Sequence, residues 1–463
     1  MKFINCYCHT DLQPLNYYLQ LNDTIVYVLD LKHKAPQLIN EAEQLGFKVY
    51  SGAAKRMTKK QHTIKTITFG TSAPTTISIT LDDKCVLRDY SWFDKRENLT
   101  AEQMKPIVDL LIKYNHPTTG CKIIEQMLKP NYANLPNTFN AAEEESYDML
   151  CMAMRGGANC VLNYDLITYE THVDYHQLYA YVMTTNTFPA LNPVLVDGFM
   201  PHPFGIYRII GGQAQLRKDG YALLSNSNSN IMFGADGEIH DLTELGAICH
   251  PDLQLLYQNY EVYDLEIAET LYYPFTFDGK TAFSDAVHTI YNGRRRNDET
   301  KSFYKLLNEY MAGYFERSLQ VGSYWLGSKR LSDMPTTTAQ YNPKVGIFIT
   351  AYGRQLLNKI LHTVPKSQVV GYDTDCIFLN CKKDDVSPKL LKSFGDMPGQ
   401  LHFDGVYKDV IHKASKSYNG YDLETNAPFR KQSGIAKSGY CWYYNGRTYE
   451  KRKSEAKENE KSW

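Results

Sequence analysis

The sequence lacks the features of a secreted, membrane-spanning or zinc-binding chain. Its ten cysteines form no Cys-x-x-Cys pair and no Cys/His spacing of the zinc-finger type. No apolar run reaches about 18 residues, and the N-terminus does not have a positive segment followed by an apolar one. We therefore expect reduced thiols, a cytoplasmic location and no contact with membrane.

The sequence also has no excess of positively charged residues. Lys and Arg number 50 against 51 Asp and Glu, so the formal net charge is −1. Any nucleic-acid surface must therefore be local, with the acidic residues elsewhere. A chain of 463 residues is long enough to form two or more subdomains.

The most informative stretch is VVGYDTDCIFLN, in which two apolar runs flank Asp373 and Asp375. The alternation predicts a β-hairpin with the acidic pair at its tip. Side chains at i and i+2 of a strand share a face, so the two carboxylates would project together. Mg²⁺ neutralises such a pair in many phosphate sites. A solvated turn is the alternative, because Asp-Thr-Asp is ordinary loop chemistry.

A second acidic position lies in THVDYHQLYAYVM. Asp174 ends a strand-like run and is followed by Leu178, Tyr179, Tyr181 and Val182 at helical spacing. A strand that ends in Asp and turns into a helix places the carboxylate at a cleft edge. Asp174 and Asp375 would thus supply carboxylates from two distant segments, as two-metal phosphoryl transfer requires.

A third stretch, GRRRNDETKSFYKLLNEYMAGYF, is cationic. Offsets of seven and four residues would place Arg294, Lys301 and Lys305 on one helical face. Such a stripe is commonly a solvated face. Beside two acidic metal segments it becomes a plausible clamp for a triphosphate.

Together these segments resemble the motifs of a family B DNA polymerase of the protein-primed group found in small bacteriophages and linear plasmids. DYHQLYAYVM resembles the first polymerase motif, with Asp174 as metal aspartate and Tyr179 beneath the incoming sugar. KLLNEYMAGYF resembles the fingers-helix motif, with Lys305 as the triphosphate-binding lysine. YDTDCIFL resembles the family's second metal motif, with Asp373 as an auxiliary carboxylate.

Further segments resemble the family's DNA contacts. Arg155-Gly156-Gly157 resembles the loop that touches template, and Lys416-Ser417-Tyr418 resembles the Lys-x-Tyr element that holds the primer end. Residues 430–439 resemble a stretch near the thumb. The resemblance covers about residues 150–440.

The sequence departs from the family at several positions. Gln177 and Ala180 replace the Ser and Pro of the first motif. In the fingers motif, Glu309 and Ala312 (Asn308 and Met311 with a shift of one residue) stand where Asn and Tyr cradle the base pair. The change removes an aromatic platform and adds negative charge.

The resemblance implies an α+β right-hand fold with palm, fingers and short thumb behind a small α/β N-terminal domain. Residues 1–145 would be a reduced exonuclease-like domain, and residues 146–440 the polymerase, with insertions near 190–250 and 317–343. Residues 441–463 would be a charged tail. The N-terminal domain should show strands at 24–29, 63–69 and 76–81 and helices at 35–45 and 101–114. No Asp-x-Glu, the family's first exonuclease signature, occurs in residues 1–150, so we expect no proofreading.

The function implied is DNA-directed DNA synthesis by two-metal nucleotidyl transfer. Mg²⁺ would be the cofactor, with Mn²⁺ as substitute, and primer-template DNA and dNTPs the partners. A terminal protein could supply the first hydroxyl, and a phage or mobile element in a bacterial cell would encode the chain. Two alternatives stay open: a degenerate polymerase that acts as a DNA-binding scaffold, and a weakly templated nucleotidyltransferase that extends ends.

Overall fold

The structure is a computed structural model that describes residues 146–227, 231–296, 301–315 and 343–432 as continuous stretches. Shorter described segments are 2–4, 26–28, 44, 48–51, 77–81, 84–89, 107, 109–111, 113–114, 120–132, 321–326, 329–335, 441–444 and 449–452. The chain divides into two compact units. The first holds Met1–Thr138 and Thr281–Tyr341, and the second holds Phe139–Lys280 and Asn342–Trp463.

The first unit contains a mixed sheet with the order β1-β2-β5-β4-β3 among its described strands. These strands are β1 (Lys2–Ile4), β2 (Val26–Val28), β3 (Lys48–Ser51), β4 (Ile77–Leu81) and β5 (Lys84–Asp89). β2 and β4 lie within two predicted strands, 24–29 and 76–81. The predicted strand at 63–69 lies outside the described residues, as do most of the predicted helices at 35–45 and 101–114.

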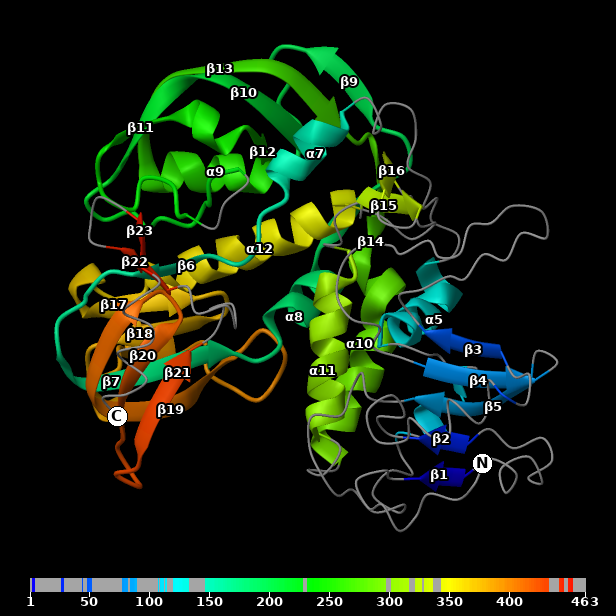
Figure 1. The fold of residues 1–463 in the computed structure, drawn as a ribbon. Coiled ribbons are helices and arrows are strands. Elements are labelled where there is room, and N and C mark those ends of the chain that lie inside the picture. Colours follow the sequence, from blue (N-terminus) through cyan, green and yellow to red (C-terminus); the bar gives the residue numbers. More distant parts are fainter. Residues whose placement is uncertain are drawn as a thin grey trace. The chain divides into compact units, whose positions relative to one another are not determined.

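Three described helices lie in the same unit as this sheet (Figure 1). They are α5 (Gly120–Tyr132), α10 (Gly279–Arg296) and α11 (Lys301–Gly313), and a hairpin of β15 (Val321–Leu326) and β16 (Lys329–Pro335) follows. The Asn131 amide donates to the Asp285 carboxylate at 2.9 Å and ties α5 to α10. Phe303, Leu307 and Met311 form the buried face of α11.

The prediction that Arg294, Lys301 and Lys305 share one helical face is wrong. Arg294 lies on α10, whereas the two lysines lie on α11. The helices pack together because Gly293 has no side chain: a Cβ there would lie 2.2 Å from the ring of Tyr304. Lys301 and Lys305 alone share an exposed face, one helical turn apart.

The second unit is built on an antiparallel sheet, which we call the palm sheet, with the described strands in the order β21-β20-β19-β7-β18-β17-β6. Its central strands are β7 (Ile167–Tyr175), β18 (Cys376–Leu379) and β17 (Val369–Asp373), and β6 (Asn159–Val161) closes one edge. β19 (Leu401–Ala414), β20 (Ser417–Asp422) and β21 (Pro428–Gln432) continue it on the other side of β7. β-Branched and aromatic residues are in the majority in the central strands β7, β17 and β18, as a half-buried pleated surface favours.

A second sheet has the described order β11-β10-β13-β9, with β12 paired to β10. Its strands are β9 (Val194–Asp197), β10 (Gly205–Leu216), β11 (Ile239–Asp241), β12 (Ala247–Cys249) and β13 (Tyr260–Tyr272). Residues 190–250, where loops and an insertion are predicted, therefore contain several strands. β8 (Thr187–Ala190) pairs with β14 (Phe275–Asp278).

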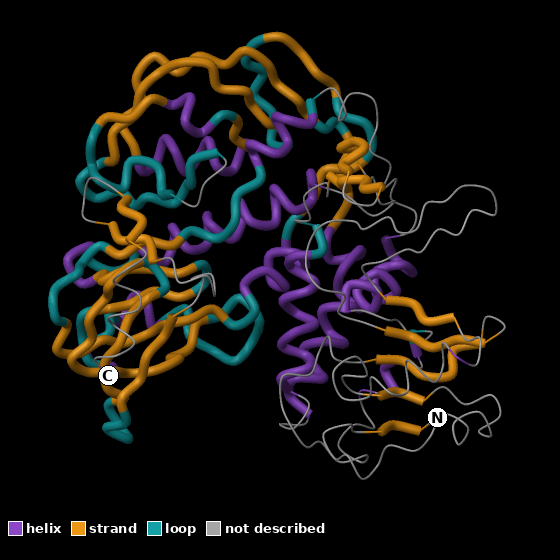
Figure 2. The backbone as a smooth tube through the Cα atoms, in the orientation of Figure 1, coloured by secondary structure: helices purple, strands orange, loops and turns teal. Residues whose placement is uncertain are grey.

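Helix α12 (Pro343–Leu361) joins these parts into one core. It lies between the two sheets of the second unit, with α7 (Tyr147–Ala153), α8 (Leu178–Thr185) and α9 (His250–Asn259) around it (Figures 1 and 2). Leu357 and Leu361 of α12 belong to the same buried cluster as Val173 and Ile377 of the palm sheet. One face of the palm sheet is thus covered by helix, and the residues that alternate with Val173 and Ile377 face the other way.

The segment 441–463, which we predict to be a charged tail, contains two described strands. β22 (Cys441–Tyr444) and β23 (Tyr449–Arg452) pair as an antiparallel hairpin. The run Cys-Trp-Tyr-Tyr followed by Asn445-Gly446 is a standard hairpin signal. The prediction of a tail takes only the charged residues of this segment into account. None of the described helices is both long and apolar enough to cross a membrane.

Candidate active site

The predicted hairpin is present. β17 and β18 pair antiparallel, with Asp373 opposite Cys376 and a two-residue turn between them. Thr374 in the turn has a positive φ of 63°, and the Asp375 N–H donates to the Asp373 carbonyl at 2.7 Å. The Thr374 N–H donates to the Ala158 carbonyl at 2.7 Å, which fixes the tip against the segment before β6.

Asp174 lies next to this tip. It is the penultimate residue of β7, close to the strand end as predicted, and the last residue, Tyr175, donates its N–H to the Asp375 carbonyl at 3.0 Å. Burial, and then the charges of Asp375 and Asp404, raise the pKa of Asp174 to about 8. Burial, and then Asp373, raise the pKa of Asp375 to about 6. The structure thus brings Asp174, Asp373 and Asp375 together, and their repulsion favours a bound cation.

Two residues of this site are absent from the sequence prediction: His402 and Asp404 of β19. Single ligand atoms of Asp174, His402 and Asp404 all lie within 4.8 Å of one another. Among the described residues, no hydrogen-bond donor reaches the buried Oδ1 of Asp174. Since a buried carboxylate oxygen is costly without a partner, the site fits a divalent ion. No local pattern reveals His402 and Asp404, because only the pairing of β19 with β7 brings them here.

Lys416 also reaches the site. It occupies the tight turn between β19 and β20 with φ 64°, and its Nζ lies 3.0 Å from Oδ1 of Asp373. The neighbouring Ser415 hydroxyl donates to the side chain of Asn159 at 2.6 Å. The ammonium group therefore balances Asp373, whereas the other two aspartates have no cation this close among the described ion pairs.

Tyr418, predicted to touch the primer, belongs to the interior. Its side chain is 3% exposed and packs with Ile167, Val370, Phe378 and Val410. Lys416 lies in the turn and Tyr418 lies on β20, so their side chains meet different surroundings. A direct contact between Tyr418 and DNA conflicts with this burial.

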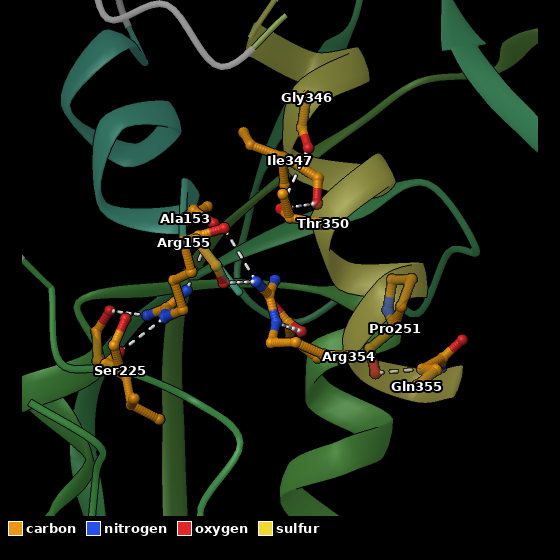
Figure 3. Close-up of polar contacts among 12 residues, drawn as sticks. Ala153, Arg155, Ser225, Pro251, Gly346, Ile347, Thr350, Arg354 and Gln355 are labelled. Atoms are coloured by element: carbon orange, nitrogen blue, oxygen red, sulfur yellow. Dashed lines mark hydrogen bonds and ion pairs between the residues drawn. The ribbon is translucent and has the colours of Figure 1, made fainter. Parts of the chain in front are cut away.

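Arg155, predicted to contact template, is also buried, with 3% of its side chain exposed. Its guanidinium donates to the carbonyls of Ser225, at 2.9 Å, and Leu245 (Figure 3). Arg354 of α12 donates to the carbonyls of Arg155 and Gly156 and forms a bidentate pair with Asp252. Arg155 therefore holds this loop in place and is not available to a nucleic acid.

The two glycines after Arg155 differ from each other. Gly156 is exposed, and a Cβ there would meet nothing within 4 Å. A Cβ on Gly157 would lie 2.5 Å from Cγ2 of Thr374. Gly157 is therefore required by the close approach of this loop to the acidic hairpin, independently of any DNA contact.

Tyr179 lies in the first turn of α8 and is half-buried. Its ring lies against α12, since a Cβ on Gly353 would be 2.9 Å from Cε1 of Tyr179. Gln177, which precedes the helix, adopts φ 50° and turns the chain sharply after Asp174. Lys301, Lys305 and Arg294 belong to the first unit and the carboxylates to the second.

Comparison with solved structures gives the class of the fold: it is similar to the right-hand fold of phi29 DNA polymerase. Phi29 DNA polymerase in a ternary complex with primer-template DNA and incoming nucleotide matches with a TM-score of 0.66 and 16% identity. The match covers 92% of this chain and 86% of that one. Its binary complex with primer-template DNA gives 0.65 at the same identity, over 91% and 85%. An orthorhombic crystal form gives 0.63, over 93% and 88%.

This likeness confirms the predicted right-hand fold of family B and the resemblance drawn from the motifs, at the level of fold. Searches by sequence add nothing: no family model and no curated protein matches the chain.

Proposed function

We propose that this protein is a DNA-directed DNA polymerase that adds dNTPs to a 3′-hydroxyl on primer-template DNA. The observation that carries the proposal is that Asp174 of β7 lies beside Asp375, in the turn between β17 and the neighbouring strand β18, where the Tyr175 N–H donates to the Asp375 carbonyl. The fold supports it, because the matching structures hold primer-template DNA and nucleotide. Carboxylates that converge from separate segments are the protein component of two-metal phosphoryl transfer.

Asp174 and Asp375 would hold the divalent ions, with Asp404 and His402 at one side of the site. When bound, such ions activate the attacking hydroxyl and stabilise the leaving pyrophosphate. Lys416, already paired with Asp373, would present its ammonium group to the primer end. Tyr179 would form one wall of the pocket for the sugar. The triphosphate would be bound by the exposed lysines of α11, Lys301 and Lys305, and by Arg294 of α10.

A second part of the proposal concerns the group that serves as the first primer. A DNA 3′-end and a Ser, Thr or Tyr side chain of a terminal protein would each supply a hydroxyl group as the nucleophile. Likeness of fold supports the DNA end, because the matching structures contain primer-template DNA. A terminal protein would be revealed by a labelled dNTP that becomes covalently attached to a co-expressed protein in the absence of a DNA primer.

Primer extension tests the proposal. We expect purified protein to extend a labelled primer on template with Mg²⁺ or Mn²⁺, and Asp174→Asn and Asp375→Asn to lose at least ~10³-fold of the rate, about 4 kcal/mol of transition-state stabilisation. Asp165→Asn, an exposed aspartate between β6 and β7, is the matched control. Extension by either active-site variant at the wild-type rate would refute the assignment.

The same assay separates the alternatives. A scaffold protein would bind primer-template without extending it under any metal. A weakly templated end-extending enzyme would add nucleotides equally to single-stranded and template-primed DNA. We expect extension only on template-primed DNA, with the product following the template sequence.

A further inference from the structure

Strand pairing, ring stacking and backbone hydrogen bonds hold His402 beside Asp174. The two residues are directly paired across β19 and β7, so their side chains lie on the same face of the palm sheet. The ring of His402 stacks on the ring of His176, with centroids 3.8 Å apart and planes 8° from parallel. Backbone bonds hold the two segments together: His176 N–H donates to the Gln400 carbonyl at 2.8 Å, and Gly399 N–H donates to the His176 carbonyl at 2.7 Å.

Asp404 approaches the same point through an irregularity in the strand. The register of β19 against β7 shifts between Phe403 and Gly405, which makes Asp404 the extra residue of a bulge. Bulges re-aim side chains beside active sites. Two ligands of one octahedral ion are about 3 Å apart in adjacent positions and about 4 Å apart in opposite ones. Ligand atoms of Asp174, His402 and Asp404 lie within 4.8 Å of one another, which is close to those separations.

We propose that His402 is a nitrogen ligand of the divalent ion held by Asp174 and Asp404, and that it makes this site select a first-row transition ion such as Mn²⁺ over Mg²⁺. Mg²⁺ takes oxygen ligands in strict octahedral geometry. Imidazole instead binds transition ions, and its affinity for the divalent ones follows the Irving–Williams order. The proposal rests on the metal role that the proposed function gives Asp174. The proposal adds to that function the ion that the site prefers and the residue, His402, that determines this preference.

The test uses the full-length protein with metal alone, without DNA or nucleotide. Mn²⁺ and Mg²⁺ affinities come from titration followed by the electron paramagnetic resonance signal of free Mn²⁺, with Mg²⁺ as competitor. Pulsed measurements on bound Mn²⁺ detect coupling to a directly ligated ¹⁴N. His402→Phe is the informative variant, because a phenyl ring preserves the stack on His176 and removes the nitrogen. His288→Gln, an exposed histidine of α10, is the control.

We expect wild-type protein to bind Mn²⁺ at least about tenfold more tightly than Mg²⁺ and to show ¹⁴N coupling. His402→Phe should lose the coupling and most of the preference, with Mg²⁺ affinity nearly unchanged, whereas His288→Gln should match wild type. Equal affinities for the two ions in wild type, absence of ¹⁴N coupling, or coupling that persists in His402→Phe would overturn the proposal. Circular dichroism of each variant establishes that it is folded.

Primer extension on the same samples separates this inference from the proposed function. Nitrogen-coupled Mn²⁺ that depends on His402, in a protein that extends no primer, would uphold the ion site and refute the polymerase. Extension that depends on Asp174, without nitrogen coupling, would uphold the polymerase and refute the role of His402.

Discussion

Asp373 and Asp375 differ in what balances their charge. Asp373 has the Lys416 ammonium 3.0 Å away and accepts a hydrogen bond from the Thr374 hydroxyl at 3.2 Å. Asp375 has no cation this close among the described ion pairs, and its raised pKa reflects burial and the charge of Asp373. A carboxylate that is already paired has less need of a metal ion.

We therefore expect Asp373→Ala to reduce primer extension by about tenfold, and Asp375→Ala to abolish it. The Asp373 variant should also raise the Michaelis constant for primer-template, because Lys416 loses the partner that orients it. Steady-state kinetics against primer-template concentration measures both effects. Equal losses in the two variants would mean that Asp373 is itself a metal ligand.

The raised pKa of Asp174 predicts how stability depends on pH. Its folded-state pKa is about 8, well above that of a carboxyl group in the unfolded chain. The native state therefore keeps a proton that the unfolded state has lost. This contribution to stability is complete below the unfolded pKa and disappears as pH rises through about 8.

In the presence of a chelator, the melting temperature should thus fall by several degrees between pH 5.5 and 8.5. Asp174→Asn should flatten that dependence, and Mn²⁺ should raise the melting temperature of wild type most at high pH. Differential scanning fluorimetry measures all three. A melting temperature that rises with pH in wild type would contradict the raised pKa.

At the scale of elements, the acidic hairpin depends on the loop before β6. A Cβ on Gly157 would lie 2.5 Å from Cγ2 and 2.9 Å from Cβ of Thr374, so a methyl group there must displace the hairpin tip. We expect Gly157→Ala to slow extension at least about tenfold, since a displacement of about 1 Å near the reacting groups is costly. Gly156→Ala, which meets no atom within 4 Å, should cost less.

A second substitution tests that explanation. Thr374→Gly removes the colliding atoms and suits the positive φ of residue 374. The double variant Gly157→Ala/Thr374→Gly should therefore recover part of the rate lost by Gly157→Ala alone. Additive losses in the double variant would show that the clash is not the cause.

The helices of the second unit are joined through Arg354. This residue is 2% exposed, pairs with Asp252 of α9 at 2.7 Å and donates to the Arg155 and Gly156 carbonyls (Figure 3). Arg354→Met leaves the Asp252 carboxylate buried without its cation, so we expect a loss of about 3–5 kcal/mol in unfolding free energy. Urea denaturation measures it, and Arg354→Met/Asp252→Leu should lose less than Arg354→Met.

Helices and strands can be predicted from the sequence where the pattern that indicates them lies within one short stretch. The alternation around Asp373 and Asp375 fixes a hairpin, and the strand-to-helix pattern fixes the place of Asp174. His402, Asp404 and the burial of Arg155 depend on pairings between distant segments, which no single stretch contains. Offsets of seven and four residues treat Arg294, Lys301 and Lys305 as parts of one helix, and such spacing alone does not show that they belong to two helices, α10 and α11.

At the scale of the whole molecule, the fold raises the question of a second activity. The family that the motifs resemble carries a 3′–5′ exonuclease ahead of its polymerase domain, and hydrolysis there needs carboxylates that converge from separate segments. Residues 1–150 contain no Asp-x-Glu. We therefore predict that the protein does not shorten end-labelled single-stranded DNA with Mg²⁺ or Mn²⁺ in the absence of dNTPs. Stepwise shortening that co-elutes with the protein and survives Asp174→Asn would reveal a separate nuclease site and make the N-terminal unit a proofreading domain.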